Sequence, residues 1–193
     1  MGEMNIDRLL QQRDEEKGLA GAIPPLDQWQ PPLSGDMNLR IHADGSWWHE
    51  GRPFARPKVA RLLASLLRHD EDGYCLVTPV ERWRIEVEDL PLVAVEADFR
   101  DGAWWFTTQF DDVIRLDGEH PLSITLTPQG EAVPQLPLRF GLAARLHRNV
   151  YYQLVEAAET REVDNGVTEV GLMSAGQWFA LGQLDDESLG EAP

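Results

Sequence analysis

The sequence predicts an α+β protein built from two related halves. A short motif occurs twice, because Asp44-Gly45-Ser46-Trp47-Trp48 is matched 57 residues later (44 to 101) by Asp101-Gly102-Ala103-Trp104-Trp105. In each half, segments with a period of two, typical of strands, accompany one segment with helical spacing of its apolar residues. Duplication is the simplest explanation, and we divide the chain into residues 1–34 (helix and linker), 35–96 (first repeat), 97–182 (second repeat) and 183–193 (acidic tail).

The first half begins with a short amphipathic helix predicted over residues 5–20 and an extended linker over residues 23–34, where four prolines remove amide donors. Residues 37–41 and 46–49 then predict a hairpin around Asp44-Gly45. Residues 56–69 carry leucines at helical spacing, and Asp72-Gly73 is expected to end that helix. Strands are expected over residues 75–78, 84–87 and 92–99.

The second half repeats this order. Strands enter and leave the Asp101-Gly102 turn, and further strands are expected over residues 113–116, 123–126 and 136–140. A long helix is predicted from Leu142 to about Thr160, because Leu142, Leu146, Val150 and Leu154 share one face. Two last strands, residues 167–173 and 177–181, precede the acidic tail.

Composition limits the classes of protein to be considered. The chain has 193 residues, of which 42% are hydrophobic, enough for a packed core. Its 33 acidic and 17 basic residues give a net charge of −16, so extended DNA is not expected as a partner. The single cysteine, Cys75, allows no intramolecular disulfide, and we find neither an export signal nor an apolar stretch of ~20 residues. These features predict a cytoplasmic protein without membrane insertion.

The chain lacks the motifs of the common enzyme classes. There is no Gly-rich phosphate loop and no dinucleotide fingerprint, the five histidines lack metal-ligand spacing, and no serine or cysteine lies in a nucleophile context. Glu119-His120 is interpreted as part of a bend at Pro121. We therefore expect no cofactor, no metal and no catalytic residue.

Positive charge is segregated in this acidic chain. Residues 51–69 contain five basic and no acidic residues, and residues 132–155 contain three arginines and again no acid. If the halves pack with these elements facing, Arg40, Arg56, Arg61, Arg139 and Arg145 would form a cationic pocket for a compact planar anion such as a nucleotide. The alternative is that each arginine is paired with one of the 33 carboxylates.

The repeated tryptophans also have two interpretations. Aromatic residues commonly stabilise paired strands, which favours a packing role for both pairs. In the functional interpretation one tryptophan of each pair faces inward, while Trp47 or Trp104 stacks on the ring of a ligand.

Two other functions stay open. A protein-interaction adaptor would use sheet edges and the Pro-rich residues 24–32 to dock a partner by strand addition. An enzyme would use carboxylates such as Asp36, Glu81 or Glu119 as general acid or base.

Several short runs resemble the bacterial DUF1285 family, a domain of unknown function. They span about residues 23–182 and comprise Pro32–Met37 with Arg40, Asp44-Gly45, Gly51-Arg52-Pro53, Arg56-Pro57, Val77–Glu81, Asp89-Leu90-Pro91, Glu119–Leu122, and Arg139 with Tyr151–Val155. The resemblance implies a duplicated α+β core, a C-terminal half like pleckstrin-homology folds, and a cleft between the halves for a nucleotide-like or nucleic-acid-derived ligand, with a role in signal transduction. The residues that we predict to bind this ligand are Asp36, Arg40, Trp47, Arg56, Arg61, Glu81, Trp104, His120, Arg139 and Arg145.

Overall fold

The computed structural model describes residue 6, residues 23–163 and residues 166–184. Apart from residue 6, the predicted helix over residues 5–20 lies outside these ranges, and so do all but the first two residues of the predicted tail. Two compact units make up the chain: unit 1 comprises residues up to Pro91 together with Arg139–Leu142, and unit 2 comprises Leu92–Leu138 and the residues from Ala143 onward. The predicted domain limits at residues 34, 96 and 182 stay predictions.

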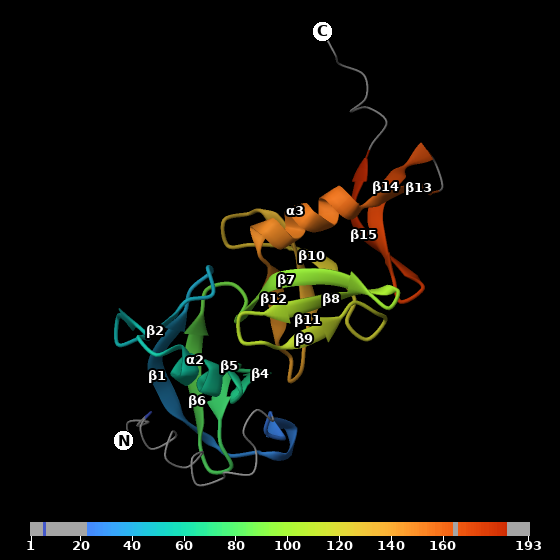
Figure 1. Ribbon diagram of the computed structural model, residues 1–193. Coiled ribbons are helices and arrows are strands. Elements are labelled where there is room, and N and C mark those ends of the chain that lie inside the picture. The colour runs from blue at the N-terminus through green and yellow to red at the C-terminus, as the bar shows by residue number, and fades with distance from the viewer. Residues whose placement is uncertain (1–5, 7–22, 164–165, 185–193) are drawn as a thin grey trace. The chain divides into compact units, whose positions relative to one another are not determined.

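Unit 1 contains a six-stranded sheet in the order β3-β2-β1-β6-β5-β4 (Figure 1). Only the central pair, β1 and β6, runs parallel, and the other neighbours are antiparallel. The elements are η1 (Leu26–Gln28), β1 (Leu33–Ile41), β2 (Trp47–His49), β3 (Arg52–Pro53), α2 (Pro57–Ala64), β4 (Leu67–Asp70), β5 (Gly73–Val77) and β6 (Arg82–Val87).

Unit 2 contains a second six-stranded sheet, in the order β9-β8-β7-β12-β11-β10, and a smaller sheet of three strands (Figure 1). Its central pair, β7 and β12, is again the parallel one. The elements are β7 (Leu92–Arg100), β8 (Ala103–Thr108), β9 (Val113–Arg115), β10 (Ser123–Leu126), β11 (Ala132–Pro137), β12 (Ala143–Leu146), α3 (Arg148–Ala157), β13 (Glu159–Glu162), β14 (Thr168–Ser174) and β15 (Gln177–Leu184).

The two large sheets share one topology. In each, three antiparallel strands are followed by three more, and the sixth strand lies parallel to the first. This confirms the α+β class and the duplication predicted from the tryptophan motif. The helices differ between the units, because α2 lies between the third and fourth strands whereas α3 follows the sixth. The predicted likeness of unit 2 to pleckstrin-homology folds stays a prediction.

The duplicated motif marks the first turn of each sheet. Gly45 has a φ of 83° in the turn between β1 and β2, and Asp101 and Gly102 have φ values of 52° and 74° between β7 and β8. The second turn, with two successive positive φ angles, is of type I′, which matches the twist of a two-residue hairpin and favours Asp-Gly. In the first turn only the glycine has a positive φ, and the hydrogen bond from the His42 amide to the Ser46 oxygen closes a three-residue loop. Both predicted hairpins are thus confirmed, and each places its Trp pair at the start of the returning strand.

Two predicted helices were too long. Residues 143–146 form β12 between β11 and β7, although their spacing also fits a helix, because pairing with distant strands outweighs local propensity. The helix predicted over residues 56–69 ends at Ala64, and Leu67–Asp70 form β4. Asp72-Gly73 is therefore the turn from β4 to β5 and not a helix terminus.

The large sheets are held by apolar side chains on one face. In unit 1 the fully buried residues include Leu39, Ile41, Leu63 and Leu76, so α2 contributes to the same core as β1 and β5. In unit 2 Leu92, Phe106, Leu136 and Leu154 are equally inaccessible. In the described part of the chain, every helix is too short or too polar to cross a membrane.

Candidate functional site

Opposite charges form a ladder on the strands at the centre of the unit 1 sheet. Asp36 on β1 accepts a 2.6 Å hydrogen bond from Nε of Arg84 on β6, and Arg40 pairs in the same way with Glu86 at 2.7 Å. The residues of each pair are in register across the parallel strands. The hydrogen bond from Arg84 lowers the pKa of Asp36. This carboxyl is therefore ionised at neutral pH and does not suit the role of general acid.

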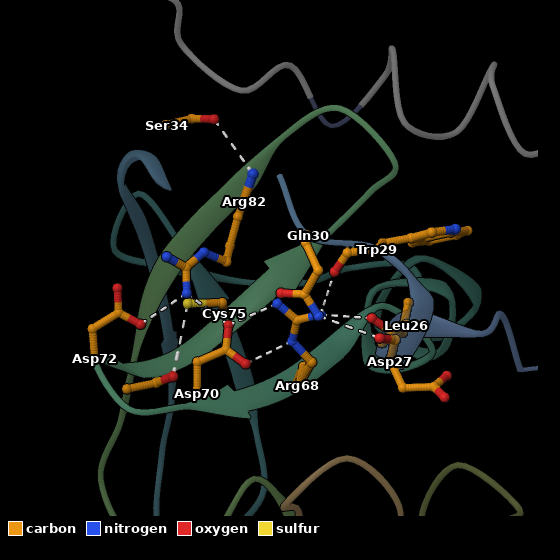
Figure 2. A network of polar contacts seen from close by, with 11 residues as sticks. Leu26, Asp27, Trp29, Gln30, Ser34, Arg68, Asp70, Asp72, Cys75 and Arg82 are labelled. Carbon is orange, nitrogen blue, oxygen red and sulfur yellow. Dashed lines mark hydrogen bonds and ion pairs between the residues drawn. The ribbon is translucent and has the colours of Figure 1, made fainter. Parts of the chain in front are cut away.

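Arg68 on β4 holds the Pro-rich segment against the sheet (Figure 2). Its Nη1 donates to the main-chain oxygens of Leu26 at 2.6 Å and Trp29 at 2.7 Å. Its Nε and Nη2 donate to the two carboxylate oxygens of Asp70, at 2.6 and 2.9 Å. Such a bidentate pair is among the stronger hydrogen-bond arrangements in proteins. Since Leu26 is completely buried, the segment is part of the packed fold rather than a free docking element.

Arg82 on β6 extends this network to the turn between β4 and β5. Its Nη1 donates to Asp70 at 2.7 Å and to Asp72 at 3.0 Å (Figure 2). Burial would raise the pKa of Asp70, but the hydrogen bonds from Arg68 and Arg82 outweigh that effect and lower it. The same hydrogen bond to Asp70 raises the pKa of Arg82, because it stabilises the charged guanidinium group.

Asp70, Asp72 and Cys75 bring three potential metal-ligand atoms within 4.8 Å of one another. Arg82 already donates to both carboxylates. Burial, reinforced by the charges of Asp70 and Asp72, raises the pKa of the Cys75 thiol to about 11, so the sulfur stays protonated at neutral pH. A metal ion would have to displace the guanidinium group and ionise the thiol. The donor set therefore fits a hydrogen-bond network better than a metal centre.

An open hollow of about 740 Å³ lies over this network. Both of its arginines, Arg68 and Arg82, are committed to carboxylates. The remaining charged groups in its lining are acidic, apart from His69, which stacks on Tyr74 with ring centroids 4.2 Å apart. The hollow is therefore a poor receptor for an anion. Its lining comprises Asp27, Gln30, Pro31, Arg68, His69, Asp70, Glu71, Asp72, Arg82 and Phe140.

A different part of unit 1 gathers cations. Four basic side chains, which we call the β3–α2 basic surface, are exposed on β3, at the N-cap of α2 and on α2 itself: Arg52, Arg56, Lys58 and Arg61. Arg52, Arg56 and Lys58 make no ion pair with any residue that the structure describes. The first turn of α2 also lacks an acidic residue. Arg56 and Lys58 therefore add positive charge at the N-terminal, positive end of a helix.

An aromatic pair adjoins these cations. His49 is the cross-strand partner of Arg52, and its ring stacks on Phe54 with centroids 6.0 Å apart and an interplanar angle of 19°. Both rings are half-buried. The β3–α2 basic surface therefore combines three cations that lack an ion pair with the described residues, Arg52, Arg56 and Lys58, with an aromatic stack. Cations and aromatic rings are the two kinds of group that bind flat anionic ligands.

The remaining predicted site residues of unit 1 have local structural contacts. Trp47 is 4% exposed and belongs to the core, as the packing interpretation of the tryptophans predicts. Its neighbour Trp48 is half-buried and meets His42 edge to face at 5.1 Å. Glu81 accepts a 2.9 Å hydrogen bond from the indole of Trp83. Arg139 lies in the segment 139–142, whose Phe140 oxygen accepts from the amide of His69.

In unit 2 the predicted residues also serve the fold. Trp104 is 8% exposed and packs edge to face on Phe99 at 5.6 Å. His120 lies 3.3 Å from Asp117 in the loop before β10. Arg145, on β12 rather than on a helix, is 7% exposed and donates to the Thr125 hydroxyl at 2.8 Å and the Val133 oxygen at 2.9 Å. The predicted meeting of the arginines between the repeats stays a prediction.

Three residues that organise unit 1 are not among the predicted site residues: Arg68, Asp70 and Arg82. The helix predicted over residues 56–69 contains Arg68 and ends just before Asp70, and residues two apart on a helix do not face each other. Recognising residues 67–70 as a strand would have placed both side chains on one face of the sheet. Arg52 and Lys58 were counted within the basic window, and only coordinates reveal that they lack ion-pair partners there.

The fold and these contacts define the chain as a duplicated α+β protein with a charge-paired sheet and a basic surface. Its residues 24–90 match the N-terminal domain of DUF1285, a domain of unknown function, and residues 91–181 match the C-terminal domain of that family. The chain belongs to the DUF1285 family.

Two solved structures are similar to it. A DUF1285 family protein from Silicibacter pomeroyi DSS-3 is 33% identical, covers 95% of this chain and 98% of its own, and has a TM-score of 0.77. A DUF1285 family protein from Shewanella baltica OS155 is 31% identical over 62% of this chain and 91% of its own, with a TM-score of 0.51. No curated protein is similar enough to this chain to count as a match. Membership thus establishes the family and assigns no activity.

Proposed function

We propose that this protein is a non-enzymatic binding module whose β3–α2 basic surface takes a small anionic, nucleotide-like ligand. One observation carries the proposal: in a chain of net charge −16, three neighbouring exposed cations have no ion-pair partner among the described residues. By contrast, the cations on the central strands are paired, as Arg40 and Arg84 illustrate.

Electrostatics favour a compact ligand over a long one. Three cations that repel one another raise the energy of the unliganded surface, and an anion placed among them relieves that repulsion. A phosphate group suits guanidinium groups, which donate two parallel hydrogen bonds to it. The acidic remainder of the chain repels extended polyanions at long range, so a nucleotide fits better than DNA.

The aromatic pair supplies a second kind of contact. A base stacked on an aromatic ring contributes about 1–3 kcal/mol. His49 and Phe54 lie beside Arg52, so they take the stacking role that sequence analysis gave to Trp47 and Trp104. A module of this kind suits signal transduction, in which ligand binding and not catalysis carries the information.

Isothermal titration calorimetry with inorganic phosphate, AMP, ATP and a short oligonucleotide tests the proposal. We expect a nucleotide to bind, and the triple variant Arg52→Gln/Arg56→Gln/Lys58→Gln to weaken its binding by at least about tenfold, because charge-assisted hydrogen bonds contribute about 1.5–3 kcal/mol each. Affinity should also fall as salt is raised.

Arg148→Gln is the matched control. Arg148 is an exposed cation on the other helix, α3, and likewise has no ion pair with the described residues. This variant should bind as tightly as the wild type. If none of the anions binds, or if the triple variant and the control bind equally well, the proposal is wrong.

A further inference from the structure

The edge strand β10 of unit 2 has an uncovered apolar side. β10 is the last strand of its sheet and pairs on one side only, with β11. Ile124 is 41% exposed and Leu126 is 69% exposed. They lie two residues apart and therefore share one face of the strand. Exposed apolar edge strands are templates for pairing with another chain, and proteins usually protect them.

The register reveals which main-chain groups point outward. The amide of Thr127 donates to the Glu131 oxygen at 2.8 Å, and this bonded pair closes the β10–β11 hairpin. In an antiparallel ladder bonded and non-bonded pairs alternate, so the pairs Thr125–Val133 and Ser123–Gln135 are the bonded ones. Ile124 and Leu126 consequently direct their N–H and C=O groups away from β11. Pro134, which has no amide hydrogen, faces Ile124 and fits this assignment.

Two other edge strands among the described residues are protected. The outer strand β13 of the small sheet carries three charged residues, Glu159, Arg161 and Glu162. The edge strand β4 of unit 1 is bridged by the hydrogen bond from the His69 amide to Phe140. β10 has no charged residue within its four positions, Ser123–Leu126. It therefore lacks the charge that discourages pairing.

We propose that β10 is a docking site for an extended peptide with an apolar centre and basic ends, which binds by strand addition. Two outward residues, Ile124 and Leu126, would supply main-chain hydrogen bonds, and their side chains would pack on alternate apolar residues of the peptide. The acidic residues Glu119 and Glu131 flank the strand, are exposed, and form no ion pair with the described residues. They complement lysine or arginine at the two ends of the peptide.

Charge also disfavours a second copy of this chain as the occupant. A second copy would bring another edge that carries Glu119 and Glu131, from a chain with a net charge of −16. Like charges brought together in this way oppose the pairing. A basic peptide meets no such repulsion, so the edge is better suited to a heterologous peptide.

Fluorescence anisotropy with a labelled peptide, Lys-Val-Thr-Val-Thr-Val-Lys, tests the site in the full chain. We expect saturable binding, at least about tenfold weaker binding of the same peptide with glutamate ends, and loss of binding when alternate main-chain nitrogens of the peptide are methylated. The methylated peptide tests main-chain pairing without altering the protein.

Two variants locate the binding. Ile124→Pro removes an outward N–H, the position at which an edge strand tolerates proline, and Leu126→Lys places a positive charge on the edge. Both should weaken binding at least about tenfold, whereas Val113→Lys on the opposite edge strand β9 should leave it unchanged. The proposal is overturned if the peptide does not bind, if methylation has no effect, or if sedimentation velocity shows that the edge is occupied by a second copy.

Discussion

Arg68 and Asp70 connect three separate parts of unit 1 through two side chains. The guanidinium group reaches two main-chain oxygens of the Pro-rich segment, and the carboxylate holds both Arg68 and Arg82. The Arg68 side chain is 9% exposed, so loss of its carboxylate partner leaves a largely buried positive charge. Removing one member of a buried ion pair lowers the free energy of unfolding by much more than a surface ion pair contributes to it.

We predict that Asp70→Asn lowers the free energy of unfolding by about 3 kcal/mol at pH 7. Since the pKa of Asp70 is lower in the folded than in the unfolded state, its contribution is present above the unfolded value, near 3.8, and is lost as pH falls through the folded value. Urea unfolding at several pH values should therefore show a shallower acid decline for the variant. The surface residue Asp98, 3.6 Å from Arg100, provides the control, because Asp98→Asn should cost less than about 1 kcal/mol. Equal losses for both variants would contradict this account.

The burial of the tryptophans was predictable at this scale, and the charge network was not. A tryptophan on a strand after an Asp-Gly turn points to one of the two faces of the sheet. Trp47 and Trp104 both lie on the buried face. The partners of Arg68 come from residues 26, 29 and 70, so no local pattern indicates them. Ion pairs between strands depend on register, which the sequence specifies only through the complete sheet.

Among the elements, the hairpin of β14 and β15 is joined to the large sheet of unit 2 by hydrogen bonds of Ser174 and Ala175. Ser174 is completely buried, accepts a 2.9 Å hydrogen bond from the Trp104 amide, and donates at 2.7 Å to the Leu116 oxygen. The amide of Ala175 adds a bond to the Gly102 oxygen. These contacts fix the small sheet to the duplicated Asp-Gly turn.

We predict that Ser174→Ala lowers the free energy of unfolding by about 1–3 kcal/mol, because it leaves a buried donor and a buried acceptor without partners. Thermal and urea unfolding measure this loss. The exposed Ser123 on β10 offers a comparison, since Ser123→Ala should change stability by no more than about 0.5 kcal/mol. A Ser174 variant as stable as the wild type would mean that the small sheet is held by other contacts.

Element prediction succeeded where the signals were local. Period-two alternation and Asp-Gly turns identified the hairpins that begin each sheet. It failed for residues 143–146, whose spacing with Leu142 and Val150 fits a helix although they form the central strand β12. That strand is specified by its pairing with β7, about fifty residues earlier in the chain. A short apolar run by itself does not distinguish a helix from a strand.

Across the whole molecule, charge is the feature that points to function. The family assigns no activity, and the carboxylates of the charge-paired sheet are held by arginines. The β3–α2 basic surface is distinguished by Arg52, Arg56 and Lys58, which have no ion-pair partner among the described residues, in a chain that has nearly two acidic residues for every basic one. Binding of an anion is the simplest use of such an arrangement.

Binding of an anion to the β3–α2 basic surface is measured most directly by a two-dimensional NMR titration with the nucleotide that binds in calorimetry. The account predicts saturable shifts of the backbone amides of residues 49–61, including His49 and Phe54, that are absent in the Arg52→Gln/Arg56→Gln/Lys58→Gln variant. The amides around Arg148 should not move. Shifts confined to other residues, or shifts that persist unchanged in the triple variant, would contradict the assignment of the basic surface as the binding site.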